Sequence, residues 1–168
     1  SSGTWTVSAS DGTATSTLTG TTTSATFSGL AANKTYTFTV TNASGCVSTS
    51  SGTAVLSAQP QTPTAPIIGA ITEATCSVAT GSVALSGLPS SGTWTVSASD
   101  GTATSTLTGT TTSATFSGLA ANKTYTFTVT NASGCVSTSS GTAVLSAQPT
   151  TPTAPIIGAI TEATCSVA

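Results

Sequence analysis

Residues 118–130 read Gly-Leu-Ala-Ala-Asn-Lys-Thr-Tyr-Thr-Phe-Thr-Val-Thr. In the second half of this stretch threonine alternates with an apolar side chain, which is the two-residue period of a strand with one buried face. The pattern predicts that Tyr125, Phe127 and Val129 point into a core. Leu119 precedes Tyr125 by six residues, and a leucine, a short turn and a strand-opening tyrosine are typical of a tyrosine corner. We therefore expect the tyrosine hydroxyl to bond to backbone a few residues upstream, where the chain crosses between two sheets.

A tandem repeat organises the whole chain. A shift of 89 residues lays Ser90–Ala168 on Ser1–Ala79. The 79 aligned positions differ only where Gln61 meets Thr150. Such near-identity indicates a tandem array, and one period is close in length to a β-sandwich domain of about 100 residues.

The period divides the chain into three predicted pieces. We expect residues 1–62 to be the C-terminal part of one sandwich, 63–152 a complete repeat, and 153–168 the first strand of the next. Neither end piece closes a core alone. We therefore expect a longer parent protein, or ends that fray or pair between molecules.

Composition favours an uncharged all-β protein. Charged residues make up 4% of the chain, histidine is absent and the formal net charge is -2. Abundant threonine and valine with few charged helix formers disfavour α-helix. Lys34 and Lys123 are the only cations, too few to neutralise a row of phosphates or to hold an anionic membrane surface. No apolar run approaches the roughly 20 residues of a membrane-spanning helix, so neither nucleic-acid binding nor membrane insertion is expected.

The alternating runs of one period predict seven strands. They are expected at residues 67–72, 81–86, 93–98, 102–108, 112–116, 124–130 and 142–146, with a tight turn at Asp100-Gly101. Regularly spaced turns between such strands predict a sandwich with Greek-key connections. Pro60, Pro63 and Pro66 recur at every third residue before the first strand, which favours a polyproline-like joint and a semi-rigid string of domains.

The large inward-facing side chains of both copies are the predicted core. They are Trp5, Tyr36, Phe38, Trp94, Phe116, Leu119, Tyr125, Phe127 and Val129. Trp94 is expected at the centre because it is the largest of them.

The same residues carry a family resemblance. The run from Ser117 to Val129, with Trp94 on an earlier strand, resembles a fibronectin type III or related immunoglobulin-like module. A wider set of motifs resembles the tandem repeats of very large surface proteins of gliding Bacteroidota, the SprB-type adhesins exported by the type IX secretion system. These motifs are Ser-Gly-Leu-Ala-Ala, Thr-Tyr-Thr-Phe-Thr-Val-Thr-Asn-Ala-Ser-Gly-Cys, and an earlier Ala-Thr-Cys before a Gly-Ser-Val-Ala-Leu strand. The resemblance implies an extracellular filament at the cell surface, with neighbouring repeats and an extracellular surface or polysaccharide as partners.

Each period holds two cysteines, Cys46 and Cys76, then Cys135 and Cys165. Without histidine or a Cys-x-x-Cys motif they do not predict a metal site. In an exported protein disulfides are the better interpretation. Cys76 with Cys135 lies within one repeat, although a fibronectin-like strand order would place these two at opposite poles. The alternatives are Cys46 with Cys76 and Cys135 with Cys165 across the domain joint, or pairing with repeats beyond this chain.

No catalytic chemistry is predicted. Each period has one aspartate, Asp11 or Asp100, at a turn, and one glutamate, Glu73 or Glu162. These are too few for an acid–base pair or a calcium site, and the many hydroxyl groups lack a base to activate them. A lysine in a turn is usually solvated, so an isopeptide cross-link through Lys123 is not expected. We predict no catalytic residue, no cofactor and no metal ligand.

Three functions fit these features. The favoured one is a non-enzymatic repeat of a surface adhesin, a semi-rigid stalk that projects a binding region and supports attachment and, by the resemblance, gliding. In the second, the repeats themselves bind glycans or ice through outward threonines in Thr-x-Thr spacing, although threonine is also simply a good residue for a soluble strand. In the third, the repeats are the spacer of a secreted enzyme.

Overall fold

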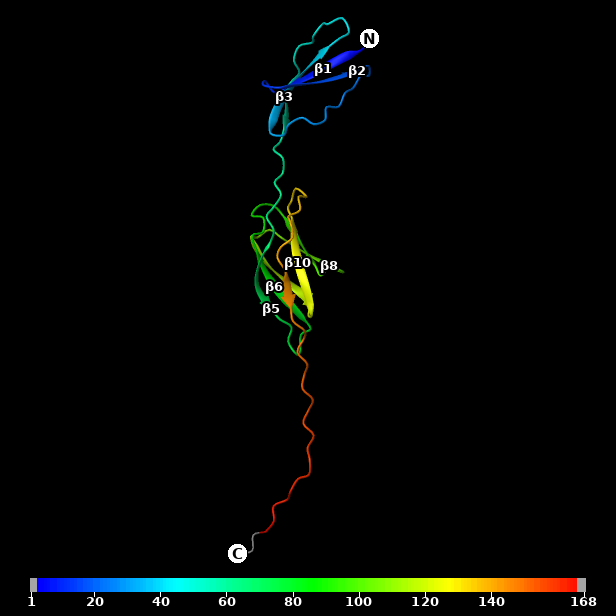
Figure 1. Ribbon diagram of the computed structural model, residues 1–168. Coiled ribbons are helices and arrows are strands. Elements are labelled where there is room, and N and C mark those ends of the chain that lie inside the picture. Colours follow the sequence, from blue (N-terminus) through cyan, green and yellow to red (C-terminus); the bar gives the residue numbers. More distant parts are fainter. Residues whose placement is uncertain (1–2, 166–168) are drawn as a thin grey trace. The chain divides into compact units, whose positions relative to one another are not determined.

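The computed structural model describes residues 3–165 of the chain (Figure 1). The chain divides into two compact units, Ser1–Gln61 and Thr62–Ala168, which we name unit 1 and unit 2. The strands of the described residues all pair antiparallel, and these residues contain no helix, which confirms the all-β prediction. Over the same residues, no helix long and apolar enough to span a membrane is present.

Unit 2 forms seven strands over residues 62–165. They are β5 (Ile67–Thr72), β6 (Thr80–Ser86), β7 (Trp94–Ser99), β8 (Thr104–Gly109), β9 (Ser113–Ala120), β10 (Lys123–Thr130) and β11 (Ala143–Leu145). One sheet has the order β5-β6-β9 and the other the order β11-β10-β7-β8. Each predicted segment overlaps one of these strands. β9 runs beyond the predicted end at Phe116 because β6 pairs with it as far as Ala120.

A single core joins the two sheets of unit 2. Its buried side chains come from both: Val83, Leu85, Leu88, Phe116 and Leu119 on one side, and Trp94, Val96, Ala98, Tyr125, Phe127, Val129, Ala143 and Leu145 on the other. The rings of Phe116 and Phe127 lie 5.8 Å apart between centroids, a favourable distance for a tilted aromatic pair. Trp94 is 1% exposed. Its indole ring covers Gly109 so closely that any Cβ there would overlap it.

A tyrosine corner connects β9 to β10. The backbone N–H of Ala120 donates to the Tyr125 hydroxyl at 3.0 Å, and the hydroxyl lies 3.5 Å from the carbonyl oxygen of Ala120. The turn between them contains Asn122 at a φ of 59°, a left-handed conformation in which asparagine is enriched. The predicted bond from the tyrosine hydroxyl to upstream backbone is thus confirmed.

Two serines protect the edge of β10 where β11 does not reach. β11 pairs only with Lys123–Tyr125. Further along, Val129 donates its N–H to the hydroxyl of Ser137 at 2.9 Å, and Phe127 donates to that of Ser140 at 2.9 Å. The N–H groups of the two serines donate in return to the carbonyls of Val129 and Phe127, each at 2.8 Å. Together the two serines therefore satisfy the backbone N–H and C=O groups of Val129 and Phe127, as a neighbouring strand would.

Replacing Ser137 by alanine is expected to lower the free energy of unfolding of unit 2 by about 1–3 kcal/mol, because the N–H of Val129 loses its acceptor. Ser137 is 7% exposed, so water cannot take its place. Ser48 makes the same bond to Val40 at 2.9 Å on the exposed sheet of unit 1. Ser48→Ala should therefore lower the free energy of unfolding of unit 1 by clearly less. Urea unfolding followed residue by residue by NMR measures both variants, and equal losses would contradict this account.

Over residues 3–61, unit 1 forms one sheet. Its strands are β1 (Trp5–Ser10), β2 (Thr15–Gly20), β3 (Lys34–Thr41) and β4 (Ala54–Leu56), in the order β2-β1-β3-β4. They repeat β7, β8, β10 and β11 of unit 2. Residues 24–31 carry the sequence of β9 but form no strand. The reason is that the described residues of unit 1 contain no counterpart of β6 with which they could pair.

The missing cover changes the burial of two predicted core residues. Trp5 and Phe38 are only half-buried, whereas their copies Trp94 and Phe127 are 1% and 0% exposed. Tyr36 remains buried, at 5%. The prediction of Trp5 and Phe38 as core residues is corrected to half-buried positions, because no strands equivalent to β5 and β6 cover them among residues 3–61.

Candidate functional site

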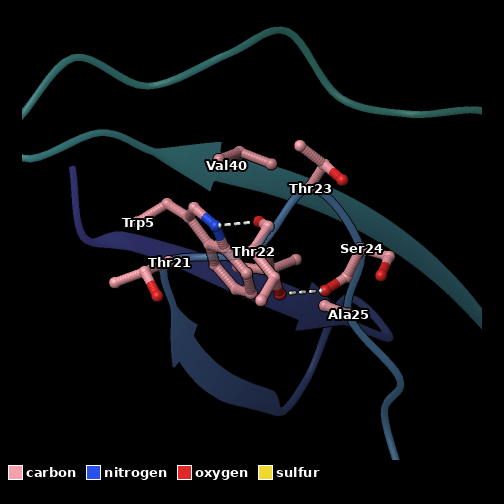
Figure 2. A pocket seen from close by; sticks show the side chains of 8 residues that line it. Trp5, Thr21, Thr22, Thr23, Ser24, Ala25 and Val40 are labelled. Carbon is pink, nitrogen blue, oxygen red and sulfur yellow. Dashed lines mark hydrogen bonds between the residues drawn. The ribbon is translucent and has the colours of Figure 1, made fainter. Parts of the chain in front are cut away.

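Open hollows lie along the inner face of the unit 1 sheet, which no second sheet covers among residues 3–61. Figure 2 shows the indole of Trp5 at its centre, with its Nε1 donating to the carbonyl of Thr22 at 2.6 Å. The hydroxyl of Thr22 in turn donates to the carbonyl of Ser24 at 2.8 Å. The ring lines an open hollow of about 340 Å³ together with Val7, Thr21, Thr22, Thr23, Ser24, Ala25 and Val40.

Two more hollows continue the first along the same face. One, of about 540 Å³, shares Val7 and Ala25 with it and is otherwise lined by Thr26, Phe27, Leu30 and Phe38. The other, of about 350 Å³, shares Trp5 and Val40 with the first and is otherwise lined by Gly3, Thr4, Asn42, Ala43 and Ser44. We name the residues lining these three hollows the open face of unit 1. Its lining combines aromatic and aliphatic side chains with threonine, serine and asparagine, and it contains no charged side chain.

Unit 2 shows the same side chains covered. Val40 is 41% exposed on the open face, and its copy Val129 is 0% exposed. Val83 and Leu85 of β6 belong to the same core as Val129. The open face therefore results from the absence of a covering sheet and not from a different sequence.

A second candidate surface is a regular array of hydroxyl groups on the outer face of the β11-β10-β7-β8 sheet. The strand register places these residues in three rows: Thr130, Thr95 and Thr108; Thr128, Ser97 and Thr106; Thr126, Ser99 and Thr104. Rows lie about 6.8 Å apart along the strands, and strands about 4.8 Å apart. The register of β3, β1 and β2 repeats the array in unit 1. The array carries no charged side chain.

A charged pair lies beside the turn between β7 and β8. Asp100 Oδ1 accepts the N–H groups of Thr102 and Ala103 at 2.9 and 2.7 Å and the hydroxyl of Thr102 at 2.8 Å. Its Oδ2 lies 3.0 Å from Nζ of Lys123, at the start of β10. The N–H of Ala103 first, and then the ammonium of Lys123, hold the pKa of Asp100 well below its ordinary range. The pair in turn raises the pKa of Lys123.

The lowered pKa of Asp100 predicts acid sensitivity of unit 2. Such a carboxylate stabilises the fold above the pKa of the unfolded chain, about 3.9, and this contribution is lost as pH falls through the folded pKa. We expect the urea midpoint of unit 2 to fall below about pH 4. Asp100→Ala should lower the urea midpoint of unit 2 at pH 7, and it should make that midpoint depend less on pH in acid. Asp11 pairs with Lys34 at 3.0 Å in unit 1, so Asp11→Ala should change unit 1 alone.

The four cysteines form no disulfide. Glu73, just after β5, accepts the N–H of Ser146 at 2.8 Å, and Ser146 directly follows β11, which pairs with the start of β10. Cys76 therefore lies near the start of β10, whereas Cys135 follows its end. A strand of 8 residues spans roughly 25 Å, well beyond the roughly 7 Å between Cα atoms that a disulfide tolerates. The structure thus argues against Cys76 with Cys135, while pairing that involves Cys46 or Cys165 stays a prediction.

Other chemistry-bearing groups are dispersed. Within residues 3–165, no three histidine, cysteine, aspartate or glutamate side chains gather as a metal site would require. The sequence reasoning missed the pairing of Lys123 with Asp100, since it placed this lysine in solvent. The sequence does contain a signal for this pairing, because a lysine follows an aspartate by 23 residues in both copies. The pairs are Asp11 with Lys34 and Asp100 with Lys123.

Similarity to known proteins is found among solved structures. No protein-family model matches the sequence, and no curated protein matches it. Among solved structures, the chain is similar to the crystal structure of chicken CNTN1 FN1-FN3 domains, with 15% identity and a TM-score of 0.47. The similarity covers 84% of this chain and 55% of that one, so this chain spans about half of its length. Because the TM-score is low, the fibronectin-like fold of unit 2 rests on its strand order and tyrosine corner, features shared by such sandwiches.

Proposed function

We propose that the chain is a non-enzymatic segment of an extracellular adhesin or filament at the cell surface. In this proposal each complete repeat is a seven-stranded Greek-key sandwich of the fibronectin type III kind and one link of a semi-rigid stalk. The observation that carries it is that the polypeptide enters and leaves unit 2 at opposite ends of β5. Ile67, the first residue of β5, lies against Gly87. Ser146, which follows the last strand, is bonded to Glu73 just after β5, at 2.8 Å.

Segments on both sides of unit 2 are attached to it. On the incoming side, Pro66 is buried and Pro63 is half-buried. On the outgoing side, the Gln148 side chain donates to the carbonyls of Thr75 and Cys76 at 3.0 and 3.4 Å. A joint whose two ends are held, and whose middle is rich in proline, has few freely rotating residues. Copies joined in this way add length to a stalk without becoming a loose chain.

The sequence resemblance extends the proposal. The resemblance of the repeat motifs to those of SprB-type adhesins favours export by the type IX system, attachment to a substratum and gliding. Neighbouring repeats of the same chain and an extracellular surface or polysaccharide are the partners that follow.

Small-angle X-ray scattering of the full chain tests the stalk. We expect its maximum dimension to fit a narrow range of extended conformations, because Pro60 and Pro63 restrict the joint. The matched variant, Pro60→Gly with Pro63→Gly, should broaden that range and shorten the mean dimension. A native chain as flexible as the glycine variant would contradict the semi-rigid stalk.

Antibody labelling tests the location. Antibodies raised against the chain should label intact cells of the source organism, and mild protease treatment of those cells should remove the label. Labelling only after permeabilisation would contradict a surface role.

A second candidate function is that the repeats bind a regular surface themselves. The observation that favours it is the array of three hydroxyl rows in register on both units. Ice-recrystallisation and glycan-array assays on the full chain test it. Binding by the array should be lost in a variant that carries Thr106→Lys and Thr128→Lys, and two negative assays with the native chain would remove this candidate.

A further inference from the structure

The polypeptide enters unit 2 on one sheet and leaves it on the other. The incoming segment continues into β5, an edge strand of the β5-β6-β9 sheet, and the outgoing segment follows β11, an edge strand of the β11-β10-β7-β8 sheet. Ile67 begins β5, whereas Ser146, which follows β11, is bonded to Glu73 beyond the other end of β5. Tension along the chain therefore pulls the two sheets in opposite directions, parallel to their strands.

The core alone offers limited resistance to such a pull. The two sheets share one apolar core, and the pairing of strands stays within each sheet. Apolar contact is non-directional, so it persists while one sheet slides a short way over the other. A hydrogen bond weakens steeply as its distance and angle depart from the favoured values. Hydrogen bonds between the sheets are therefore the contacts that oppose the first movement most strongly.

Such bonds lie where the chain leaves unit 2. They join the segment after β5 to the segment after β11, and we name their residues the exit latch: Glu73, Thr75, Cys76, Ser146 and Gln148. The two carboxylate oxygens of Glu73 accept the N–H of Ser146 at 2.8 Å and its hydroxyl at 3.3 Å. The side-chain amide of Gln148 donates to the two backbone carbonyls at 3.0 and 3.4 Å. Hydrogen bonds to an ionised carboxylate are roughly twice as strong as neutral ones.

Both halves of the exit latch are anchored in the fold. Ala74 is 6% exposed, and the N–H groups of Thr75 and Val78 donate to each other's carbonyls at 2.9 and 3.2 Å. On the other side, the carbonyl of Ser146 accepts the N–H of Asn122, directly before β10, at 3.0 Å. Neither half can yield by itself, so tension reaches the bonds between them.

We propose that the exit latch carries tension between the incoming and outgoing segments of unit 2, so that the two sheets do not slide over their core until the latch opens. This inference rests on the proposed stalk, because a stalk is pulled along its length. It goes further by naming the carboxylate of Glu73 as the group that holds the two sheets in position under that pull.

Optical tweezers with handles at the two ends of the full chain test the exit latch. The lifetime of unit 2 is measured at constant force. The length released identifies the unit, since the strands of unit 2 span Ile67 to Leu145 and those of unit 1 the shorter stretch from Trp5 to Leu56. Glu73→Ala should shorten the lifetime by at least about tenfold, the effect of losing a hydrogen bond to a charged group. Glu73→Gln keeps one acceptor oxygen and should give an intermediate lifetime.

Two matched variants make the result specific. Glu162 is the copy of Glu73 and is exposed outside the strands, so Glu162→Ala should leave the lifetime unchanged. Ser137→Ala removes an acceptor within one sheet, where the bonds stay intact while the sheets begin to slide. It should lower the equilibrium stability yet shorten the lifetime by less than about threefold.

The inference is overturned if Glu73→Ala and the native chain have the same lifetime, or if Ser137→Ala or Glu162→Ala shortens it as much as Glu73→Ala does. The NMR signals of Trp94 show whether each variant is folded. If Glu73→Ala is not, Gln148→Ala takes its place with the same expected and contradicting results. Failure of the stalk is distinguishable, because scattering and antibody labelling report the joint and the location, whereas the lifetime reports the latch.

Discussion

Trp94→Ala is expected to lower the free energy of unfolding of unit 2 by about 3–5 kcal/mol, the range measured for large aromatic residues truncated in a closed core. Trp94 is 1% exposed, and its Nε1 donates to the carbonyl of Thr111 at 2.8 Å. The substitution removes both the packing of the indole ring and the donor of that hydrogen bond. It also leaves the space above Gly109 empty.

The chain supplies a control for this variant. Trp5 occupies the same position of the same sequence and makes the same bond to Thr22, at 2.6 Å, but it is only half-buried. Trp5→Ala should therefore destabilise unit 1 by clearly less than Trp94→Ala destabilises unit 2. Urea unfolding with resolved NMR signals from each unit separates the two effects. Similar losses at both positions would mean that the cover formed by β5 and β6 adds little to the burial of the indole.

Val83→Asp is expected to destabilise unit 2 by at least about 4 kcal/mol, since it buries an unpaired charge. Val83 is 0% exposed and lies in β6. The new carboxylate becomes hydrated at the lowest cost in free energy if β5 and β6 separate from the other sheet. Trp94 should then become as accessible as Trp5, which acrylamide quenching of tryptophan fluorescence in the Val83→Asp variant would report.

Ser86→Asp is the matched substitution for Val83→Asp. Ser86 lies in the same strand but is exposed, so the same charge there should change the free energy of unfolding by no more than about 0.5 kcal/mol. A large loss in Ser86→Asp would show that β6 tolerates no charge at all, and the explanation by burial would fail.

Much of the fold was predictable because inward-facing apolar residues alternate with threonine or serine almost without interruption in the strands of this sequence. Tyr125, Phe127 and Val129 alternate with threonine, and Trp94 and Val96 alternate with threonine and serine. Few charges compete with this pattern, so the position of each strand follows from periodicity and from turn residues such as Asp100-Gly101. The tyrosine corner was predictable for the same reason, since its leucine and tyrosine stand at a fixed spacing.

The candidate sites were less predictable because they depend on side chains that are distant in the sequence. The hydroxyl array needs the register of three strands, and periodicity alone does not give a register. The serines that complete the edge of β10 stand in a stretch with no strand pattern. Cys76 and Cys135 were left open for a similar reason: only the order of the strands shows that they lie at different ends of β10.

Sequence alone determined that the chain consists of strands, which side of each strand is apolar, and that the repeat recurs after 89 residues. The tertiary structure decided which of those segments become strands. Residues 24–31 and 113–120 are the same eight amino acids, yet only the second set is a strand. The physical reason is that a strand is stable only when a partner takes up its backbone hydrogen bonds and covers its apolar face, and β6 provides both for one copy alone.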